Sequence, residues 1–305
     1  MISALIPIFN EEDLIDELVK RVTETLENTG EPYEIVFIDD GSSDSSVNIL
    51  LNKKKANNNI KIISLSRNFG HQAAITAGLE YAKGDFIAIL DGDLQDPPEL
   101  MSRMFDALKS GEYDVAIGYR KERNEKNRKR RLMTRIFHWF FSRISNLDDI
   151  EHTGHFSMMT KRAKDAILTM REKTRYLPGL RSFIGFRQTK IEYVRQKRSA
   201  GESKMKLKQL ISLAADAMFA FSRIPVRVCL FLGLTGVVIF FLAGIYVLVS
   251  KYEGWAPLGW SSMLISIYFI GSIQLTFLGI LGEYLFRIYK ESQNRPLYFV
   301  KDIYE

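Results

Sequence analysis

At residues 86–99 the chain reads Phe86-Ile87-Ala88-Ile89-Leu90-Asp91-Gly92-Asp93-Leu94-Gln95-Asp96-Pro97-Pro98-Glu99. The five apolar residues at the start are typical of a short strand that is buried on both faces. The proline pair is a start signal for a helix, and residues 99–108 have helical spacing. A buried strand, an acidic turn and a helix in this order form one unit of an α/β fold.

The same alternation runs through the first 120 residues. Apolar runs predict further strands, and amphipathic stretches between them predict further helices. The expected strands are 4–9, 35–38, 60–65, 86–90 and 115–117, and the expected helices are 14–26, 45–55, 72–82 and 99–108. This rhythm predicts a mostly parallel sheet with helices on both faces, whose ligands bind beyond the carboxyl ends of the strands.

The predicted strands end in acidic rather than glycine-rich sequence. No GxGxxG follows the first strand and no GxxxxGK[ST] occurs in the chain, which disfavours a Rossmann dinucleotide site and a P-loop. Carboxylates crowded at one edge repel each other unless a cation or hydrogen-bond donors compensate. The acidic strand ends are Asn10-Glu11-Glu12, Asp39-Asp40-Gly41-Ser42-Ser43-Asp44 and Asp91-Gly92-Asp93-Leu94-Gln95-Asp96.

Asp91 and Asp93 are two positions apart, so they point to the same side if the extended conformation continues past the strand. Carboxylates without a nearby histidine or cysteine suit Mg²⁺ or Mn²⁺, whose other positions are commonly filled by substrate phosphates and water. Alone, an Asp-x-Asp sequence is more often a turn. Its place after an apolar strand, beside two other acidic strand ends, predicts a metal-bound diphosphate as the ligand.

Three segments in fixed order resemble the signatures of the GT-A-fold family 2 glycosyltransferases. They are Ile6-Pro7-Ile8-Phe9-Asn10-Glu11-Glu12, Ile38 to Asp44 and Leu90 to Glu99. More narrowly, Arg198 to Lys204 and Gly282 to Tyr298 resemble the polyprenyl-phosphate glycosyltransferases of the bactoprenol glucosyltransferase and dolichol-phosphate mannosyltransferase type. The resemblance runs from residue 2 to about residue 300 and implies a GT-A-type sheet.

The resemblance implies a role for each matching position. Pro7, Asn10 and Glu11 would line the nucleotide-sugar pocket with Asp39 and Asp40, and Asp40 would contact the base and ribose. Asp91 and Asp93 would act in catalysis by holding the metal on the diphosphate, assisted by Gln95. Arg198, Ser203 and Lys204 would bind the acceptor phosphate. Simpler readings stay open: Pro7 only shapes a strand edge, Asp40 only caps a turn, and Lys204 is only a solvated charge.

The implied reaction moves a monosaccharide from a nucleotide-diphosphate sugar, with UDP preferred, to polyprenyl (undecaprenyl) phosphate with inversion. The acceptor oxygen is already anionic, because the second pKa of a phosphate monoester is about 6, so no strong general base is required. The product would serve cell-envelope glycan modification. The sequence does not identify the sugar, and the oligomeric state, a homo-oligomer included, stays open.

The chain departs from the family at Thr153-Gly154-His155-Phe156, where many relatives carry an aspartate at the position of His155. An acidic role is therefore not transferred. His155 is a catalytic candidate as a donor to a phosphate or a sugar hydroxyl. The alternative is an ordinary hydrogen-bonding residue in the pocket wall.

Two uncharged segments predict membrane spans. Residues 228–250 and 254–282 contain 23 and 29 positions without a charge, more than the roughly 20 that a membrane helix needs. The loop between them holds only Lys251 and Glu253, and no signal peptide precedes the polar region, so both termini are expected in the cytosol of a bacterial-type inner membrane. The outer flanks carry Arg223, Arg227, Arg287, Lys290, Arg295 and Lys301.

The expected organisation has five parts: a catalytic domain (1–200), an amphipathic juxtamembrane helix (201–225), two spans (226–251 and 254–284) and a cytosolic tail (285–305). The helix is expected to lie in the membrane interface. A second amphipathic stretch at 132–144 is more readily explained as domain core.

The net charge of +6 is concentrated in one segment, because residues 120–131 contain eight basic and two acidic residues. Anionic lipid or the acceptor phosphate is the expected partner of this segment. Nucleic acid is disfavoured, because no nucleic-acid-binding signature accompanies the basic residues.

Two other functions stay in view. A processive polysaccharide synthase would be expected to show a Gln-x-x-Arg-Trp sequence and more spans, and this sequence has neither. A non-enzymatic membrane scaffold or flippase component would leave the acidic cluster without a purpose.

Overall fold

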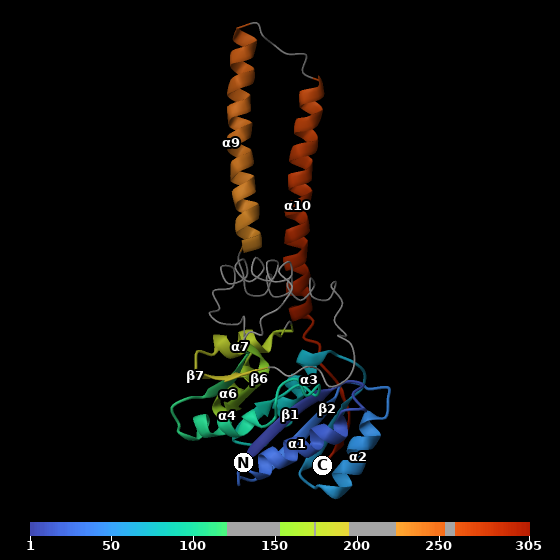
Figure 1. Cartoon of the computed structure of the whole chain (residues 1–305). Helices are drawn as coiled ribbons and strands as arrows, with labels where there is room; N and C mark the ends of the chain where they lie inside the picture. The colour runs from blue at the N-terminus through green and yellow to red at the C-terminus, as the bar shows by residue number, and fades with distance from the viewer. Residues whose placement is uncertain (121–152, 174, 195–223, 254–259) are drawn as a thin grey trace. The chain divides into compact units, whose positions relative to one another are not determined.

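The computed structural model of the chain describes residues 1–120, 153–173, 175–194, 224–253 and 260–305. The chain divides into two compact units. One contains a sheet with its covering helices, and the other contains the long helices α9 (Ile224–Tyr252) and α10 (Trp260–Ser292) (Figure 1). Several predicted segments lie outside the described residues, among them the basic residues from 121 to 131, the stretch 132–144, and residues 201–223 of the juxtamembrane helix.

The described residues form an eight-stranded mixed sheet with the order β7-β5-β6-β4-β1-β2-β3-β8. The predicted parallel arrangement is present where β1 pairs with β2 and β4, and where β2 pairs with β3. β6 runs antiparallel to both β4 and β5, and β8 runs antiparallel to β3. The strands are β1 (Ile2–Ile8), β2 (Tyr33–Asp39), β3 (Ile60–Leu65), β4 (Phe86–Ile89), β5 (Val115–Arg120), β6 (Thr153–Thr160), β7 (Gln188–Tyr193) and β8 (Val300–Tyr304).

Helices cover both faces of the sheet, as expected from the alternation. All seven residues of β1 are buried, which fits a strand packed on both sides. Ala4 and Ile6 belong to the cluster under one set of helices, whereas Leu5 belongs to the cluster under the other. The first set is α1 (Ile15–Glu27), α2 (Ser46–Ala56) and α4 (Leu100–Lys109), and the second is α3 (His71–Tyr81), α6 (Lys161–Thr169) and α7 (Leu177–Phe183).

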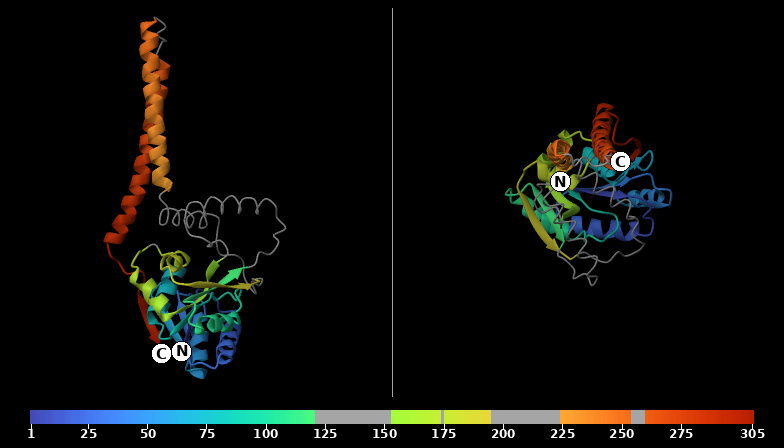
Figure 2. Two further views of the ribbon diagram at one scale, coloured as in Figure 1. Left: turned by 90° about the vertical axis from the view of Figure 1, so that its left-hand side faces the viewer. Right: turned by 90° about the horizontal axis from the view of Figure 1, so that it is seen from above.

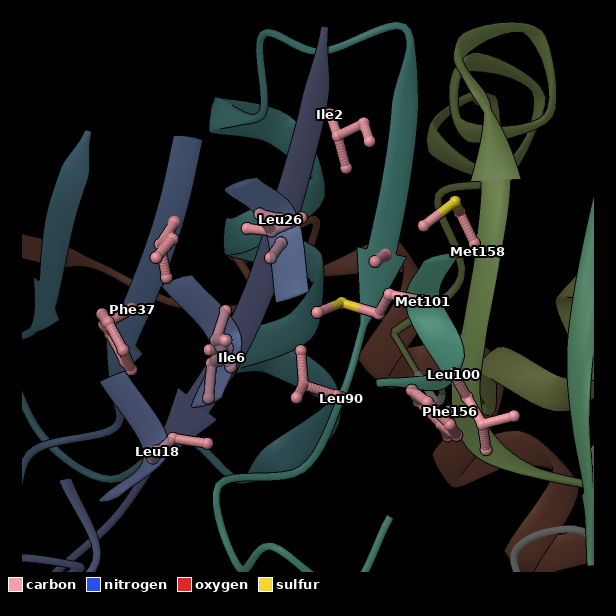
Figure 3. Packing of buried hydrophobic residues seen from close by; sticks show 14 of the residues in the cluster. Ile2, Ile6, Leu18, Leu26, Phe37, Leu90, Leu100, Met101, Phe156 and Met158 are labelled. Atoms are coloured by element: carbon pink, nitrogen blue, oxygen red, sulfur yellow. The ribbon is translucent and has the colours of Figure 1, made fainter. Parts of the chain in front are cut away.

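The first cluster joins strands that are far apart in the sequence. Figure 3 shows Leu18 of α1, Met101 of α4 and Phe156 of β6 among its members. Burying such a side chain contributes about 1.5–3 kcal/mol. The rows of apolar residues fix which face of each strand points inward, and this in turn fixes where the strand ends meet.

The last residues of the chain supply an edge strand where the sequence predicted a tail. β8 pairs with β3, with Tyr304 opposite Ile62, and Lys61 Nζ lies 2.5 Å from Glu305 Oε1. A five-residue, partly exposed strand with charged side chains has too weak a pattern to be recognised locally. Because β8 ends beside the start of β3, both termini lie at the amino edge of the sheet (Figure 2), and the carboxyl edge of the parallel strands is left for a ligand.

Of the described helices, one has the length and composition of a membrane span. It is the segment Phe269–Ser292 of α10, with a mean hydropathy of 1.4. The segment Phe231–Tyr246 of α9 is apolar but shorter. The described chain therefore gives one candidate span where the sequence predicted two, and residues 254–259 of the second predicted span lie outside the described residues.

Candidate functional site

A crevice is expected where β1 and β4 separate. The chain proceeds from β1 to β2 and β3 on one side and then places β4 on the other side, and ligands of open α/β sheets bind at such a switch point. The pairing of β1 with β4 ends at Leu5 and Ile89, and the Leu90 N–H then donates to Leu5 O at 3.1 Å. The next residue of β1 that faces this side is Pro7, which has no N–H to offer. Pro7 is therefore tolerated in a central strand because β4 has already ended.

The loops after β1 and β2 are hydrogen-bonded to each other. The Asn10 side-chain oxygen accepts from Ser43 N at 2.8 Å, and Asn10 N donates to Ser42 Oγ at 3.0 Å. Glu11 N donates to Ser46 Oγ at 3.1 Å. Asn10 has a φ of 53°, a conformation that asparagine adopts more readily than most residues. The two loops are thus joined at the carboxyl edge of the sheet, and Asn10 and Glu11 lie in them.

The two aspartates after β2 bind different loops. Asp39 Oδ1 accepts from Ser42 N at 2.9 Å and so closes the turn after β2. Asp40 accepts from Phe69 N at 2.7 Å and from Gly70 N at 2.9 Å. Burial raises the pKa of Asp40, and the two N–H donors only partly oppose this effect. The residue that closes the turn is thus Asp39, whereas Asp40 holds the loop between β3 and α3.

We expect Gly41→Ala to lower both stability and affinity for the nucleotide expected at this edge. Gly41 has a φ of +74°, and a Cβ atom there would lie 2.6 Å from the backbone carbon of Arg67. The displaced backbone belongs to the loop that Asp40 holds. Thermal unfolding and UDP titration measure the two effects.

Gly30→Ala is the matched control for the glycine variant. Gly30 also has a positive φ, +69°, but a Cβ atom there would meet nothing within 4 Å. Gly30→Ala should therefore lower the free energy of unfolding only by the left-handed backbone penalty of about 1–2 kcal/mol. Equal losses in the two variants would argue against close packing at Gly41.

The predicted metal-binding residues follow β4 in a turn rather than in a continued strand. β4 ends at Ile89, Leu94 has a φ of 54°, and Gln95 N donates to Asp93 Oδ1 at 3.1 Å. The condition under which Asp91 and Asp93 would point to the same side of an extended strand is therefore not met. Even so, Asp91, Asp93 and Gln95 are partly accessible while the residues between them are buried, so all three reach solvent.

Asp91 is held beside a histidine that the sequence analysis did not select. Its Oδ1 lies 3.2 Å from Nε2 of His71, the first residue of α3, but no aligned donor reaches this buried oxygen from the described residues. Burial alone would raise the pKa of Asp91. His71 outweighs burial and places this pKa well below its usual range. The pKa of His71 is raised in turn, because Asp91 overcomes the effect of its burial.

The chemistry of this loop fits a divalent metal. No aligned hydrogen-bond donor among the described residues reaches the buried Oδ1 of Asp91, although His71 Nε2 lies 3.2 Å from it. Carboxylate oxygens are the ligands that Mg²⁺ and Mn²⁺ prefer. Among the described residues, no three His, Cys, Asp or Glu side chains gather as a complete metal site. Such a metal would therefore take ligands from Asp91, Asp93 and Gln95 and the remainder from the substrate diphosphate and water.

His155 lies across from Asp91 at the start of β6. Ser157 pairs with Ile89, so His155 and Asp91 are each two residues beyond this pair, and the rings of His155 and His71 are 4.9 Å apart. His155 Nε2 lies 3.2 Å from Gln72 Nε2. Burial and the neighbouring His71 lower the pKa of His155 to about 4, so the ring is neutral at pH 7.

A partly buried triad anchors the end of the same loop, and the sequence analysis missed it. The Tyr193 hydroxyl donates to Asp96 Oδ1 at 2.5 Å, and Arg120 Nη2 donates to Asp96 Oδ2 at 3.3 Å. Arg120 Nε also donates to the Tyr193 hydroxyl at 3.0 Å. Burial lowers the pKa of Arg120, but Asp96 and Tyr193 reverse this, so its pKa is raised. The loop after β4 is thereby tied to β5 and β7.

His71 and Gln72 could have been found from the sequence. They follow β3 at the same carboxyl edge as the acidic residues, and the strand-end rule applied to the third strand points to them. The predicted phosphate-binding residues Arg198, Ser203 and Lys204 lie outside the described residues.

Residues 3–167 match the family Glycosyl transferase family 2. The chain belongs to this family. Its relatives include the uncharacterized glycosyltransferase YkcC of Bacillus subtilis, which is 38% identical over 99% of this chain and 94% of that protein. Bactoprenol glucosyl transferase of Shigella phage SfV is 35% identical over 99% of this chain and 98% of that protein. The resemblance drawn from the sequence is confirmed, and the protein is a glycosyltransferase.

The fold of this family 2 enzyme recurs in a solved structure. Glucosyl-3-phosphoglycerate synthase from Mycobacterium tuberculosis, in complex with Mn²⁺, UDP and phosphoglyceric acid, matches with a TM-score of 0.50. The match covers 70% of this chain and 75% of that one at 14% sequence identity. At this identity the likeness concerns the fold, and it agrees with the α/β sheet described above.

Proposed function

We propose that this glycosyltransferase transfers a monosaccharide from a UDP-sugar to polyprenyl phosphate with inversion at the anomeric carbon. The product, a polyprenyl-phosphate sugar, would serve cell-envelope glycan modification. The observation that carries the proposal is the convergence of Asn10, Asp40 and Asp91 at one edge of the sheet, where no aligned donor among the described residues reaches Oδ1 of Asp91. Full-length similarity to bactoprenol glucosyl transferases supports the lipid acceptor.

In this proposal each loop of the edge binds one part of the donor. Pro7, Asn10 and Glu11 line the nucleotide pocket with Asp39, and Asp40 contacts the base and ribose. Asp91 and Asp93 hold Mg²⁺ or Mn²⁺ with Gln95. When bound, the metal supplies positive charge to the departing diphosphate.

The proposed reaction needs no proton transfer at its centre. An oxygen of the acceptor phosphate forms a bond with the anomeric carbon, and the bond from that carbon to the diphosphate oxygen breaks. The electron pair of the broken bond leaves with UDP. Arg198, Ser203 and Lys204 orient the acceptor phosphate in this proposal.

The strand β8 supports a two-span topology for the membrane part. β1 to β7 precede α9 and β8 follows α10, yet all these strands belong to one sheet. A chain that leaves this sheet for a membrane and returns to it crosses the membrane an even number of times. If the segment Phe269–Ser292 spans, a second crossing is needed, which we assign to α9, and both termini then lie on the same side of the membrane.

The proposal is tested with the purified full-length protein. Undecaprenyl phosphate and Mg²⁺ are incubated with a panel of UDP- and GDP-sugars, and the lipid is analysed by mass spectrometry. We expect the mass of one added sugar with one UDP-sugar. If none of the donors yields a glycosyl lipid, the proposal is contradicted. A ladder of added sugars would favour a processive synthase.

A further inference from the structure

Four buried side-chain nitrogen or oxygen atoms lack a hydrogen-bond partner among the described residues, and two of them lie at the site. One is Asp91 Oδ1, which the metal proposal uses. The other is Nδ1 of His155. A buried polar atom without a partner costs about 1–3 kcal/mol, so its occurrence next to Asp91 calls for a ligand that satisfies it.

The neighbouring glutamine determines which ring nitrogen of His155 carries the proton. The Gln72 side-chain oxygen accepts from Leu177 N at 3.0 Å, so the Gln72 amide nitrogen is the atom that faces His155 Nε2 at 3.2 Å. An amide nitrogen donates and does not accept, which makes Nε2 the acceptor. A neutral imidazole that accepts at Nε2 carries its proton on Nδ1. The unpartnered atom is therefore an N–H donor.

The charges around His155 keep this donor neutral. Arg181 is 1% exposed, and its two terminal nitrogens lie 3.5 Å from the carbonyl oxygen of Gly154, the residue before His155. No carboxylate among the described residues pairs with Arg181. Together with burial and His71, this positive charge disfavours protonation of His155.

We propose that His155 Nδ1–H donates a hydrogen bond to an oxygen of the sugar-diphosphate donor, with Gln72 as the positioning residue that fixes the tautomer. This inference rests on the proposed function. The bonding oxygen would belong to the diphosphate or to a sugar hydroxyl, since both are acceptors and Asp91 would hold the diphosphate through a metal. Gln72 acts through His155 and does not touch the substrate.

Two amide substitutions test the two ring nitrogens of His155 separately. In His155→Asn the amide nitrogen can take the place of Nδ1, whereas in His155→Gln it can take the place of Nε2. We expect His155→Gln to lose about 10- to 100-fold in kcat/KM, as for the loss of a hydrogen bond to a charged or strongly polar oxygen. His155→Asn should retain at least ten times the kcat/KM of His155→Gln. The reverse order, with both proteins folded, would overturn the proposal.

Calorimetric binding of UDP and of the UDP-sugar distinguishes the two sources of the oxygen. If the oxygen is on the diphosphate, His155→Gln lowers the affinity for both UDP and the UDP-sugar. If the oxygen is a sugar hydroxyl, the substitution lowers the affinity for the UDP-sugar only. Unchanged affinity for both ligands together with unchanged kcat/KM would overturn the proposal.

The tautomer is measured independently of activity by NMR of the full-length protein with ¹⁵N-labelled histidine. The His155 signals are assigned by their loss in His155→Asn. We expect a protonated Nδ1 and an unprotonated Nε2 at pH 7, and in Gln72→Glu a protonated Nε2, because a carboxylate accepts. A protonated Nε2 in the unsubstituted protein would overturn the proposal even if the protein transfers sugar. The expected tautomer in a protein that transfers no sugar would instead refute the proposed function alone.

Discussion

Asp91→Asn is expected to lower kcat for glycosyl transfer by about 10²–10³-fold, the scale seen when one preorganised charge-stabilising group is removed from an active site. Asp91 presents a buried oxygen that no aligned donor reaches, beside His71. An asparagine keeps the size of the side chain but removes the charge that would hold a divalent metal. Initial rates of glycosyl-lipid formation, followed by mass spectrometry, measure the effect.

Ligand-induced stabilisation gives a second readout of Asp91. A ligand at 100 times its Kd stabilises a protein by about 2.7 kcal/mol. Mn²⁺ with UDP should therefore raise the unfolding temperature of the unsubstituted protein, and Asp91→Asn should abolish most of this rise. Asp106→Asn makes the same charge change on the exposed side of α4 and should behave like the unsubstituted protein. If Asp91→Asn retains turnover and the metal-dependent rise, the proposed metal site is wrong.

The carboxylates of the site were predictable because their placement depends only on local pattern. A run such as Phe86 to Leu90 marks a buried strand, and parallel strands bring their carboxyl ends to one edge. Asp40 and Asp91 therefore lie at the same edge of the sheet whatever the order of the strands. Their contacts were not predictable, because Asp40 binds backbone N–H groups of a loop whose conformation the sequence does not state.

The residues that were missed depend on the order of the strands. Arg120 and Tyr193 reach Asp96 only because β5 pairs with β7 and β6 lies between β5 and β4. The apolar pattern of β7 does not determine that β7 pairs with β5. The contact between His155 and Gln72 likewise requires β6 to run antiparallel to β4. This strand pairing joins residues that are far apart in the chain.

The triad also explains how the metal-binding loop holds its shape. The loop has few regular backbone hydrogen bonds, with Leu94 in a left-handed conformation and Asp93 closing a local turn. Leu94 is buried in the core and Asp96 is fully buried against Arg120 and Tyr193. These two inward-pointing residues on either side of Gln95 fix the loop from below. Asp91, Asp93 and Gln95 are thereby left on the accessible side.

Asp96→Ala is accordingly expected to cause the largest loss of stability, about 3–5 kcal/mol, because it leaves Arg120 without its buried carboxylate and the Tyr193 hydroxyl without its acceptor. For a domain of about 200 residues this corresponds to a drop in unfolding temperature of roughly 10 °C. Turnover should fall as well, because the loop that carries Asp91 loses its anchor. Thermal unfolding and glycosyl-lipid formation in detergent measure the two effects.

Graded substitutions of the Asp96 network, and one ion pair outside it, supply the control and the contrary outcome. Tyr193→Phe removes one hydroxyl and should cost about 1 kcal/mol. Arg162→Gln breaks the ion pair with Asp114, but the Arg162 side chain is 69% exposed, so the change should cost less than about 1 kcal/mol. Combining Asp96→Ala with Arg120→Ala should cost less than the sum of the two, since the second substitution removes the stranded charge. Strictly additive losses, or an Asp96→Ala variant no less stable than Arg162→Gln, would mean that Asp96 does not anchor the loop.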